Sequence, residues 1–276
     1  MADVPAGSVT IFTDPYCPWS WAAEPHLRRL EVEFGAAGAP SFVIVGQHRR
    51  IEKPHELALE ALDAAAESGM PVDARVFLRD PPSSTHPAGL AIQAVAEQAG
   101  GSRVGAFLRR LREAILLEGR RMDTAPALLD AARETGGLDV ERLRVDFGSN
   151  AIVEAFGAQI ERARAVPEEH HAPGTGRVAI PSLEVRGPDG ERHGAYGYAP
   201  YERWREAMLA AGLEPAQQRP AAEEAVRRWG SLATPEVAAA CDLPGPRAPA
   251  ELWRLATEWR VRARPVPGGV MWSSTG

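Results

Sequence analysis

The sequence predicts an α/β domain that is interrupted by a helical block and followed by a C-terminal module. Three observations predict it. Two β-rich segments flank a helical segment within residues 8–46, helical segments fill residues 54–167, and β-character returns at 177–197 before a last helix. The chain has 276 residues, of which 45% are hydrophobic, and this is enough to bury a large core.

The first unit is a strand, a helix and a second strand. Residues 8–13 (SVTIFT) are β-rich and run into an Asp-Pro turn, so a strand ends there. From Pro18 to Phe34 the apolar residues keep a helical spacing, and proline suits a first helical turn because no amide donor is needed there. The apolar run 41–46 (SFVIVG) is typical of a buried strand. This order predicts a right-handed βαβ unit.

The following segments are mostly helical. Glycine, proline and serine breaks separate helices that we expect at about 55–68, 87–99, 103–118, 124–135, 139–147 and 150–165. Strands are then expected within 177–185 (RVAIPSLEV) and at 191–197, and a helix at 200–211. The predicted division assigns residues 1–53 and 168–213 to the α/β domain, 54–167 to a helical insertion and 214–276 to the C-terminal module.

The C-terminal module has a pattern of its own. A helix in TPEVAAAC, a turn, a helix in APAELWRLATEWR and a glycine-tipped ribbon in VRARPVPGGVMW resemble a winged-helix unit. Acidic residues balance the arginines of the second helix, so a nucleic-acid partner is not expected. Its tryptophans favour a protein partner instead, with these side chains as apolar anchors: Trp253, Trp259 and Trp272.

Charge and cysteine content narrow the function classes. The net charge of -6 argues against general attraction to nucleic acid or anionic lipid, and favours small molecules or proteins as partners. The N-terminus lacks the pattern of a secretory signal, and no run is long enough to cross a bilayer, so we expect a cytoplasmic location without membrane contact. Cys17 and Cys241 lie far apart in the sequence, so neither a disulfide framework nor a metal site is predicted.

The segment TDPYCPWSWAAEP places Cys17 at or just before a helix N-terminus. The helix dipole and the free amides there favour the thiolate, which is the reactive form. Pro18 and Trp19 stiffen the turn, and the Ser20 hydroxyl could donate a hydrogen bond to the sulfur. A buried, inert cysteine explains the same residues equally well. Further along, the Ile180-Pro181 peptide is a candidate for a cis bond at the start of a strand.

The order of elements, together with DPYCPWSW, SSTHPAGLAIQAVAEQ (83–98) and IPSLEV, resembles the DsbA-like thioredoxin-fold family. The segment DPYCPWSW looks like the active-site segment of the cytosolic FrnE-type branch, which is related to kappa-class glutathione transferases and 2-hydroxychromene-2-carboxylate isomerases. The resemblance spans about residues 8–212 and implies a thioredoxin-like fold for the α/β domain. The C-terminal module lies outside it.

The resemblance also implies a site. Cys17 takes the family's nucleophile position and Pro181 its cis-proline, whose neighbour Ile180 would pair through its backbone with a bound peptide. Ser20 stands where dithiol members have the second, resolving cysteine. The catalytic residues expected are therefore Cys17, Ser20 and Pro181, and the substrate-binding residues are Pro18, Trp19, His86 and Ile180.

The function expected from this site is monothiol thiol-disulfide oxidoreduction through mixed disulfides at Cys17. Its partners would be a disulfide or peptide substrate and a small thiol such as glutathione, with no tightly bound cofactor. This hypothesis requires an activated thiol, with a pKa well below the ordinary value of about 8.5. Two alternatives stay open: a non-redox adaptor that presents substrates to a protease, and a glutathione-dependent transferase or isomerase.

Overall fold

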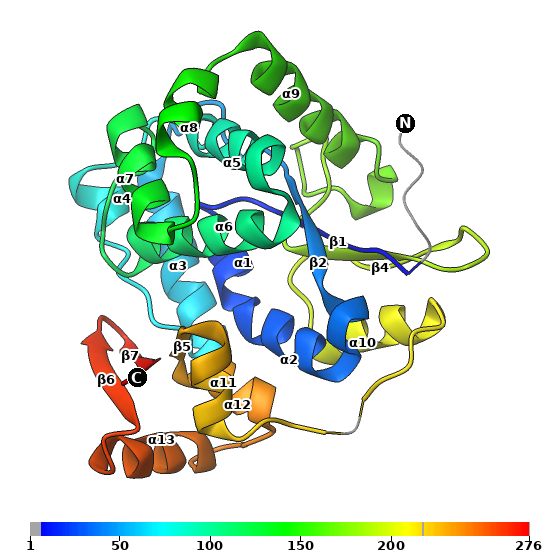
Figure 1. Cartoon of the computed structure of the whole chain (residues 1–276). Helices are drawn as coiled ribbons and strands as arrows, with labels where there is room; N and C mark the ends of the chain where they lie inside the picture. Colours follow the sequence, from blue (N-terminus) through cyan, green and yellow to red (C-terminus); the bar gives the residue numbers. More distant parts are fainter. Residues whose placement is uncertain (1–6, 217, 276) are drawn as a thin grey trace.

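The computed structural model describes residues 7–216 and 218–275, and its centre is a four-stranded mixed sheet (Figure 1). The strand order is β2 (Pro40–Ile44), β1 (Val9–Thr13), β3 (Ser182–Arg186) and β4 (Arg192–Ala195). β1 and β2 are parallel, whereas β3 runs antiparallel to β1 and β4 antiparallel to β3. The predicted strand–helix–strand unit and the returning hairpin are therefore both present.

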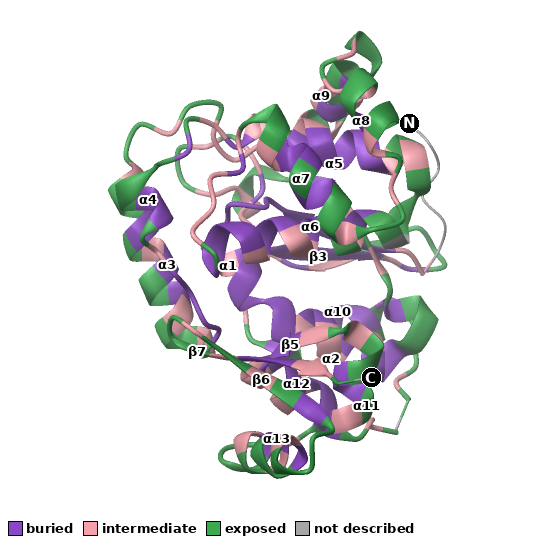
Figure 2. Ribbon diagram, turned by 60° about the vertical axis from the view of Figure 1, so that its left-hand side comes forward, coloured by how far each residue is buried: buried purple, intermediate pink, exposed green. Residues whose placement is uncertain are grey.

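Helices cover both faces of this sheet (Figures 1 and 2). Val9 and Ile11 of β1 face α2 (Glu24–Phe34) and α10 (Tyr201–Ala210), where they pack with Leu183 and Trp204. Phe12 points to the opposite face and packs beneath α9 (Asn150–Arg164) and the segment after it. β1 is buried along its whole length, and the hydroxyls of its two threonines, Thr10 and Thr13, accept hydrogen bonds from Arg162 and Arg112.

The single helix predicted from Pro18 to Phe34 is wrong, because the chain forms α1 (Pro18–Ala22) and α2 with a break at Ala23. Pro25 lies in the first turn of α2 and has no amide hydrogen, so it cannot continue the hydrogen-bond ladder of α1. The Ala23 amide closes α1 by donating to the Trp19 carbonyl at 3.1 Å. The break lets the short α1 carry Cys17 at its start.

The insertion is helical as expected. It contains α3 (Pro54–Ser68), α4 (Val76–Arg79), α5 (His86–Ala99), α6 (Gly101–Leu116), α7 (Ala125–Thr135), α8 (Val140–Asp146) and α9. α4 was not predicted, because four residues are too few to show a helical period. These helices bury one continuous core that also includes Tyr16 and Trp21 of the Cys17 segment.

The C-terminal module is more complete than the sequence indicated. It comprises α11 (Ala222–Trp229), β5 (Ser231–Ala233), α12 (Thr234–Cys241), α13 (Arg247–Thr257), β6 (Val261–Val266) and β7 (Gly269–Ser274). The strand order is β5, β7, β6, and α11 and β5 had been missed. Trp272 is only 1% exposed and belongs to the module core, so its prediction as a surface anchor is wrong; Trp253 and Trp259 are exposed.

Buried ion pairs join the C-terminal module to the rest of the chain. Glu236 of α12 is fully buried and accepts two hydrogen bonds from Arg109 of α6, at 2.8 and 2.9 Å. It also accepts from Arg28 of α2 at 3.2 Å, and Arg109 pairs in turn with Glu24 at 3.2 Å. The tip of the β6–β7 ribbon packs at Gly269 against Pro71. The module is therefore fixed to α2, to α6 and to the segment at Pro71.

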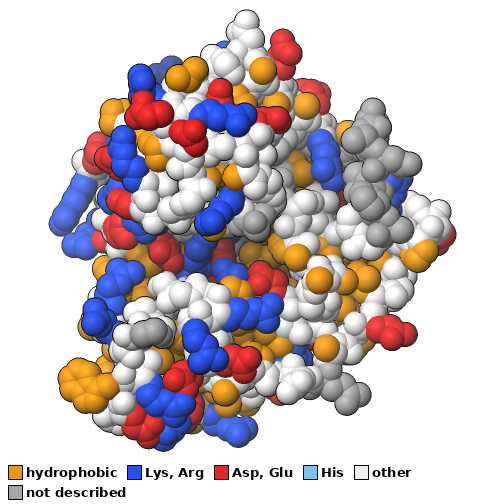
Figure 3. All heavy atoms as spheres, in the orientation of Figure 1, with side chains coloured by type: hydrophobic (Ala, Val, Ile, Leu, Met, Phe, Trp, Pro, Cys, Tyr) orange, Lys and Arg blue, Asp and Glu red, His pale blue; other side chains and the backbone are white. Residues whose placement is uncertain are grey.

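No helix in the described part of the chain is long and apolar enough to cross a membrane. Acidic and basic side chains are interspersed over the face shown in Figure 3.

Candidate functional site

Cys17 is the N-cap residue of α1, with φ −74° and ψ 114°. Its sulfur accepts a hydrogen bond from the Ser20 amide at 3.4 Å, and its carbonyl accepts from the Trp21 amide at 3.2 Å. Pro18 occupies the first helical position, where no amide donor is needed. The sequence thus places the sulfur at the end of the helix where amide hydrogens are free.

The Ile180–Pro181 peptide bond is cis. The thiol of Cys17 lies 4.0 Å from the Ile180 carbonyl oxygen, toward which it is oriented as a donor. The structure therefore brings two of the predicted site residues, Cys17 and Ser20, next to two others, Ile180 and Pro181, although Cys17 and Ile180 are 163 positions apart in the chain. Their roles in catalysis or binding stay predictions.

The environment of the thiol contradicts the expected activation. Cys17 is 1% exposed, and this burial raises the pKa of its thiol to about 11, although the Ser20 hydroxyl and amide lower it in part. The negative charges of Asp14 and Glu60 raise the pKa further. α1 has only five residues, so its dipole is small compared with the cost of burying a thiolate. The Ser20 hydroxyl lies near the sulfur but completes no hydrogen bond with any described residue, so Ser20 is hydrogen-bonded to the sulfur through its amide alone.

Trp19 leads from the thiol to an aromatic cluster that the sequence did not reveal. Its ring lies 5.0 Å from that of Tyr198, which stacks on His26 at 5.9 Å. Burial lowers the pKa of His26 to about 4, so its imidazole is neutral at pH 7. Trp19 and Tyr198 are both half-buried and give the site an aromatic border. Aromatic residues spaced along three segments carry no local motif, which is why sequence reasoning missed this contact.

His86 does not lie at the thiol. It begins α5, and its ring meets Phe156 edge-on at 5.4 Å. Among the described residues, no hydrogen bond, ion pair or ring contact joins His86 to Cys17. Burial lowers the pKa of its imidazole. The structure therefore places His86 beside the β2 end of the site and gives it no direct contact with the sulfur.

Asp14 is a site residue that the sequence indicated only as a turn former. Its carboxylate is fully buried and accepts hydrogen bonds from the amides of Tyr16 and Gln47, at 3.0 and 2.8 Å, and from the Thr85 hydroxyl at 3.1 Å. These contacts tie together the ends of β1 and β2 and the start of α5. Burial raises the pKa of Asp14 to about 6, against the lowering effect of those hydrogen bonds.

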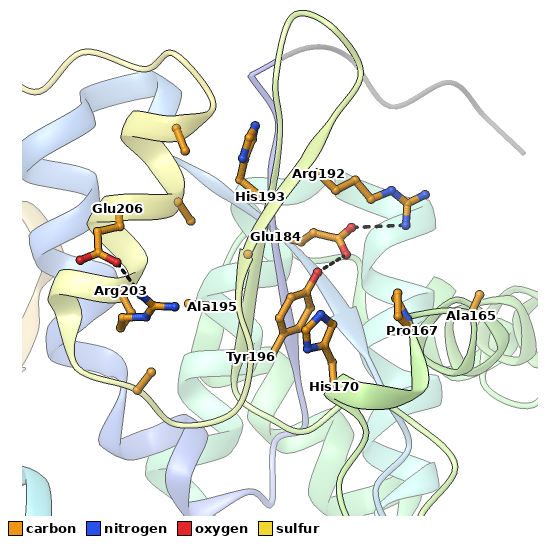
Figure 4. Close-up of a pocket in the computed structure, with 14 residues that line it drawn as sticks. Ala165, Pro167, His170, Glu184, Arg192, His193, Ala195, Tyr196, Arg203 and Glu206 are labelled. Atoms are coloured by element: carbon orange, nitrogen blue, oxygen red, sulfur yellow. Dashed lines mark hydrogen bonds and ion pairs between the residues drawn. The ribbon is translucent and has the colours of Figure 1, made fainter.

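Other potential sites are separate from Cys17. Within residues 7–216 and 218–275, no group of three or more histidine, cysteine or acidic side chains is arranged to hold a metal ion. A groove of about 790 Å³ runs along β4, between α10 and the segment at Pro167 (Figure 4). In it, Tyr196 stacks on His170 at 3.7 Å and donates to Glu184 at 3.2 Å. None of the predicted site residues lines this groove.

Comparison with known proteins agrees with this geometry. A protein-family model described as Thioredoxin matches residues 11–167, which is more than half of the chain. The chain belongs to this thioredoxin family. The predicted thioredoxin-like fold is thereby confirmed.

Two solved proteins illustrate the fold. A putative protein disulfide isomerase from Nitrosomonas europaea has a TM-score of 0.60 and 20% identity, covering 74% of this chain and 95% of that one. The cytosolic disulfide reductase DsbM from Pseudomonas aeruginosa has a TM-score of 0.55 and 22% identity, covering 74% and 98%. The structure of DsbM with GSH gives 0.54 and 21%, covering 74% and 99%. At these identities the likeness is one of fold.

A curated relative extends over nearly the whole chain. The ClpXP adapter protein SpxH of Halalkalibacterium halodurans is 27% identical over 277 aligned positions, which cover 95% of this chain and 86% of that protein. An alignment of this extent takes in most of the C-terminal module as well as the thioredoxin-like domain.

Proposed function

We propose that the protein is an adaptor that holds a client polypeptide at the Cys17–Pro181 site and presents it to a protease of the ClpXP type. The observation that carries the proposal is the state of the thiol: Cys17 is buried, its pKa is raised to about 11, and Ser20 replaces the resolving cysteine. A thiol in this state is a poor nucleophile at pH 7. The cis-proline loop that can receive an extended peptide is nevertheless retained.

Two further observations support an adaptor. The relatives that carry this name align over the C-terminal module, for which an oxidoreductase has no evident use. That module is fixed to the domain by buried ion pairs, and it exposes Trp253 (51%) and Trp259 (83%), which could contact a protein partner. Because the clients of such a protease are intracellular, this function implies a cytoplasmic location.

A second candidate function is monothiol exchange, favoured by the orientation of the Cys17 sulfur toward Ile180 and by its N-cap position. In that reaction the Cys17 thiolate attacks a substrate disulfide, forms a mixed disulfide and releases one substrate thiolate. A second thiol such as glutathione then attacks the mixed disulfide, so Cys17 leaves as thiolate and the substrate sulfur stays bonded to glutathione. The raised thiol pKa makes the first step slow at pH 7.

The two functions differ in their need for sulfur. In a strain that lacks the protein, adaptor function predicts that a set of proteins accumulates and that their half-lives lengthen. A Cys17→Ala variant should restore their degradation, since binding needs no covalent bond. If the wild type restores degradation of these proteins but Cys17→Ala does not, and if the wild type also turns over a glutathionylated peptide, the adaptor function is contradicted and monothiol exchange is supported.

A further inference from the structure

Basic side chains from two segments lie near the Cys17 site. Arg177 lies ahead of the cis-proline, and the Asp14 and Cys17 groups are close enough to act on its charge. Arg49, in the loop after β2, acts in the same way on the charge of His86. Neither arginine forms an ion pair within the described ranges. His48 and His86 complete this group, which we call the basic cluster. It stands out in a chain whose net charge is -6 and whose buried arginines, such as Arg109, are paired with carboxylates.

Short hydrogen bonds hold the segments of the basic cluster in place. Arg177 Nη2 donates to the Gln47 carbonyl at 2.8 Å, and the Thr85 amide donates to the His48 carbonyl at 2.9 Å. Ser84 also donates to the His48 carbonyl, at 3.2 Å. The His86 ring packs so closely over Gly46 that a Cβ there would lie 3.2 Å from Nε2. The basic cluster is therefore a fixed surface of three joined segments.

The same contacts place the basic cluster next to the thiol. Arg177 lies three residues before Ile180, whose carbonyl oxygen is 4.0 Å from the Cys17 sulfur. Gln47, which Arg177 contacts, donates its amide hydrogen to Asp14, three residues before Cys17. Burial lowers the pKa of Arg177, whereas the negative charges of Asp14 and Cys17 raise it. A peptide lying along the cis-proline loop would reach this guanidinium.

The basic cluster also has unused hydrogen-bonding capacity. The Nε2 atom of His48 is buried, and no described residue bonds to it. Burial lowers the pKa of both His48 and His86, so both imidazoles are neutral at pH 7. The His86 ring is hydrogen-bonded to the Gly46 backbone, whereas His48 can still offer an N–H group at Nε2. Asp14 is already taken up by its own three hydrogen bonds. Permanent arginine charge beside an imidazole donor suits a carboxylate.

We propose that the basic cluster binds a carboxylate of an extended peptide whose backbone passes between Cys17 and Pro181. This inference rests on the proposed function, and it names the client chemistry: a segment with an acidic side chain two or more residues from the point of contact. The terminal carboxylates of a small peptide thiol such as glutathione could bind the basic cluster in the same way.

Calorimetric titration of the full chain with two pairs of probes tests the proposal. The first pair is the acetylated and amidated peptide (Gly-Glu)4 and its (Gly-Gln)4 counterpart. The second pair is S-methylglutathione, which cannot form a disulfide, and its dimethyl ester. We expect the carboxylate form of at least one pair to bind at least tenfold more tightly than its neutral form, and more weakly as salt is raised.

Variants locate the binding. Arg177→Gln should weaken binding of the carboxylate probe at least tenfold, and Arg177→Lys should retain part of the affinity. The control is Arg247→Gln, which should leave the affinity unchanged, because Arg247 is an exposed residue of α13 that forms no ion pair with any described residue. Thermal melting checks that each variant is folded. Binding of (Gly-Glu)4 identifies an acidic client as the source, and binding of S-methylglutathione alone identifies the small thiol.

Three results would overturn the proposal: no binding of either carboxylate probe, equal binding of the acidic and neutral forms, or unchanged affinity in Arg177→Gln. If client half-lives in vivo still depend on the protein in any of these cases, the basic cluster is refuted and the adaptor function stands.

Discussion

Replacing Glu236 by glutamine should strongly destabilise the protein. Its carboxylate is 0% exposed and accepts hydrogen bonds from Arg109, from Arg28 and from the Ala233 amide at 2.8 Å. The Glu236→Gln side chain keeps the size but loses the charge, so two largely buried guanidinium groups lose a counter-ion. Removing one partner from a buried ion pair costs about 3–5 kcal/mol, which corresponds to a fall in melting temperature of about 6–20 °C.

Urea unfolding of the whole chain, followed by tryptophan fluorescence, measures this loss. The matched control is Glu251→Gln, because Glu251 pairs with Arg254 at the surface of α13, and its loss should change the free energy of unfolding by less than about 0.5 kcal/mol. A loss below about 1 kcal/mol for Glu236→Gln, or separate unfolding of the C-terminal module in the wild type, would refute the conclusion that this ion pair fixes the module to the domain.

Three further outcomes are expected. Ser20→Cys should leave turnover of a glutathionylated peptide slow at pH 7, because a resolving thiol acts only after Cys17 has attacked; a large gain in rate would show that the missing second cysteine, and not the raised thiol pKa, causes the inactivity. The pKa of the Asp14 carboxyl is raised to about 6 in the native state, so the native state holds this proton more tightly than the unfolded state does. As pH rises from 4 to 6, the free energy of unfolding of the wild type should therefore fall by up to about 3 kcal/mol relative to that of Asp14→Asn. Parallel pH profiles of the two proteins would contradict this expectation. Trp259→Gly should raise the free energy of unfolding by up to about 1 kcal/mol, because Trp259 has a φ of 59° at the end of α13 and is 83% exposed, and a decrease in urea midpoint would contradict that.

The backbone of the site could be predicted from the sequence, because its signals are local. A β-rich run before Asp14, a proline at the first position of α1 and the IPSLEV segment each identify their own element. The resemblance to a DsbA-like family then paired Cys17 with Pro181, and the 4.0 Å contact between Cys17 and Ile180 agrees with that pairing.

The chemistry of the site could not be predicted in the same way. The thiol pKa depends on burial by segments distant in the sequence, among them the helix that carries Glu60, and no local pattern reports this. Trp272 and Trp253 are both tryptophans, and only the packing of the module shows that Trp272 lies in its core whereas Trp253 is exposed. The position of His86 likewise follows from contacts with Gly46 and Phe156 that no motif encodes.

The rate of alkylation of Cys17 by iodoacetamide as a function of pH tests the central claim most directly. Mass spectrometry of the Cys17 peptide separates it from Cys241, whose thiol pKa is also raised to about 11 by burial. The buried thiol predicts a midpoint near 11 and, at pH 7, a thiolate population about 300-fold below that of an unperturbed cysteine. A midpoint well below 8.5 would contradict the inert thiol on which the adaptor proposal depends.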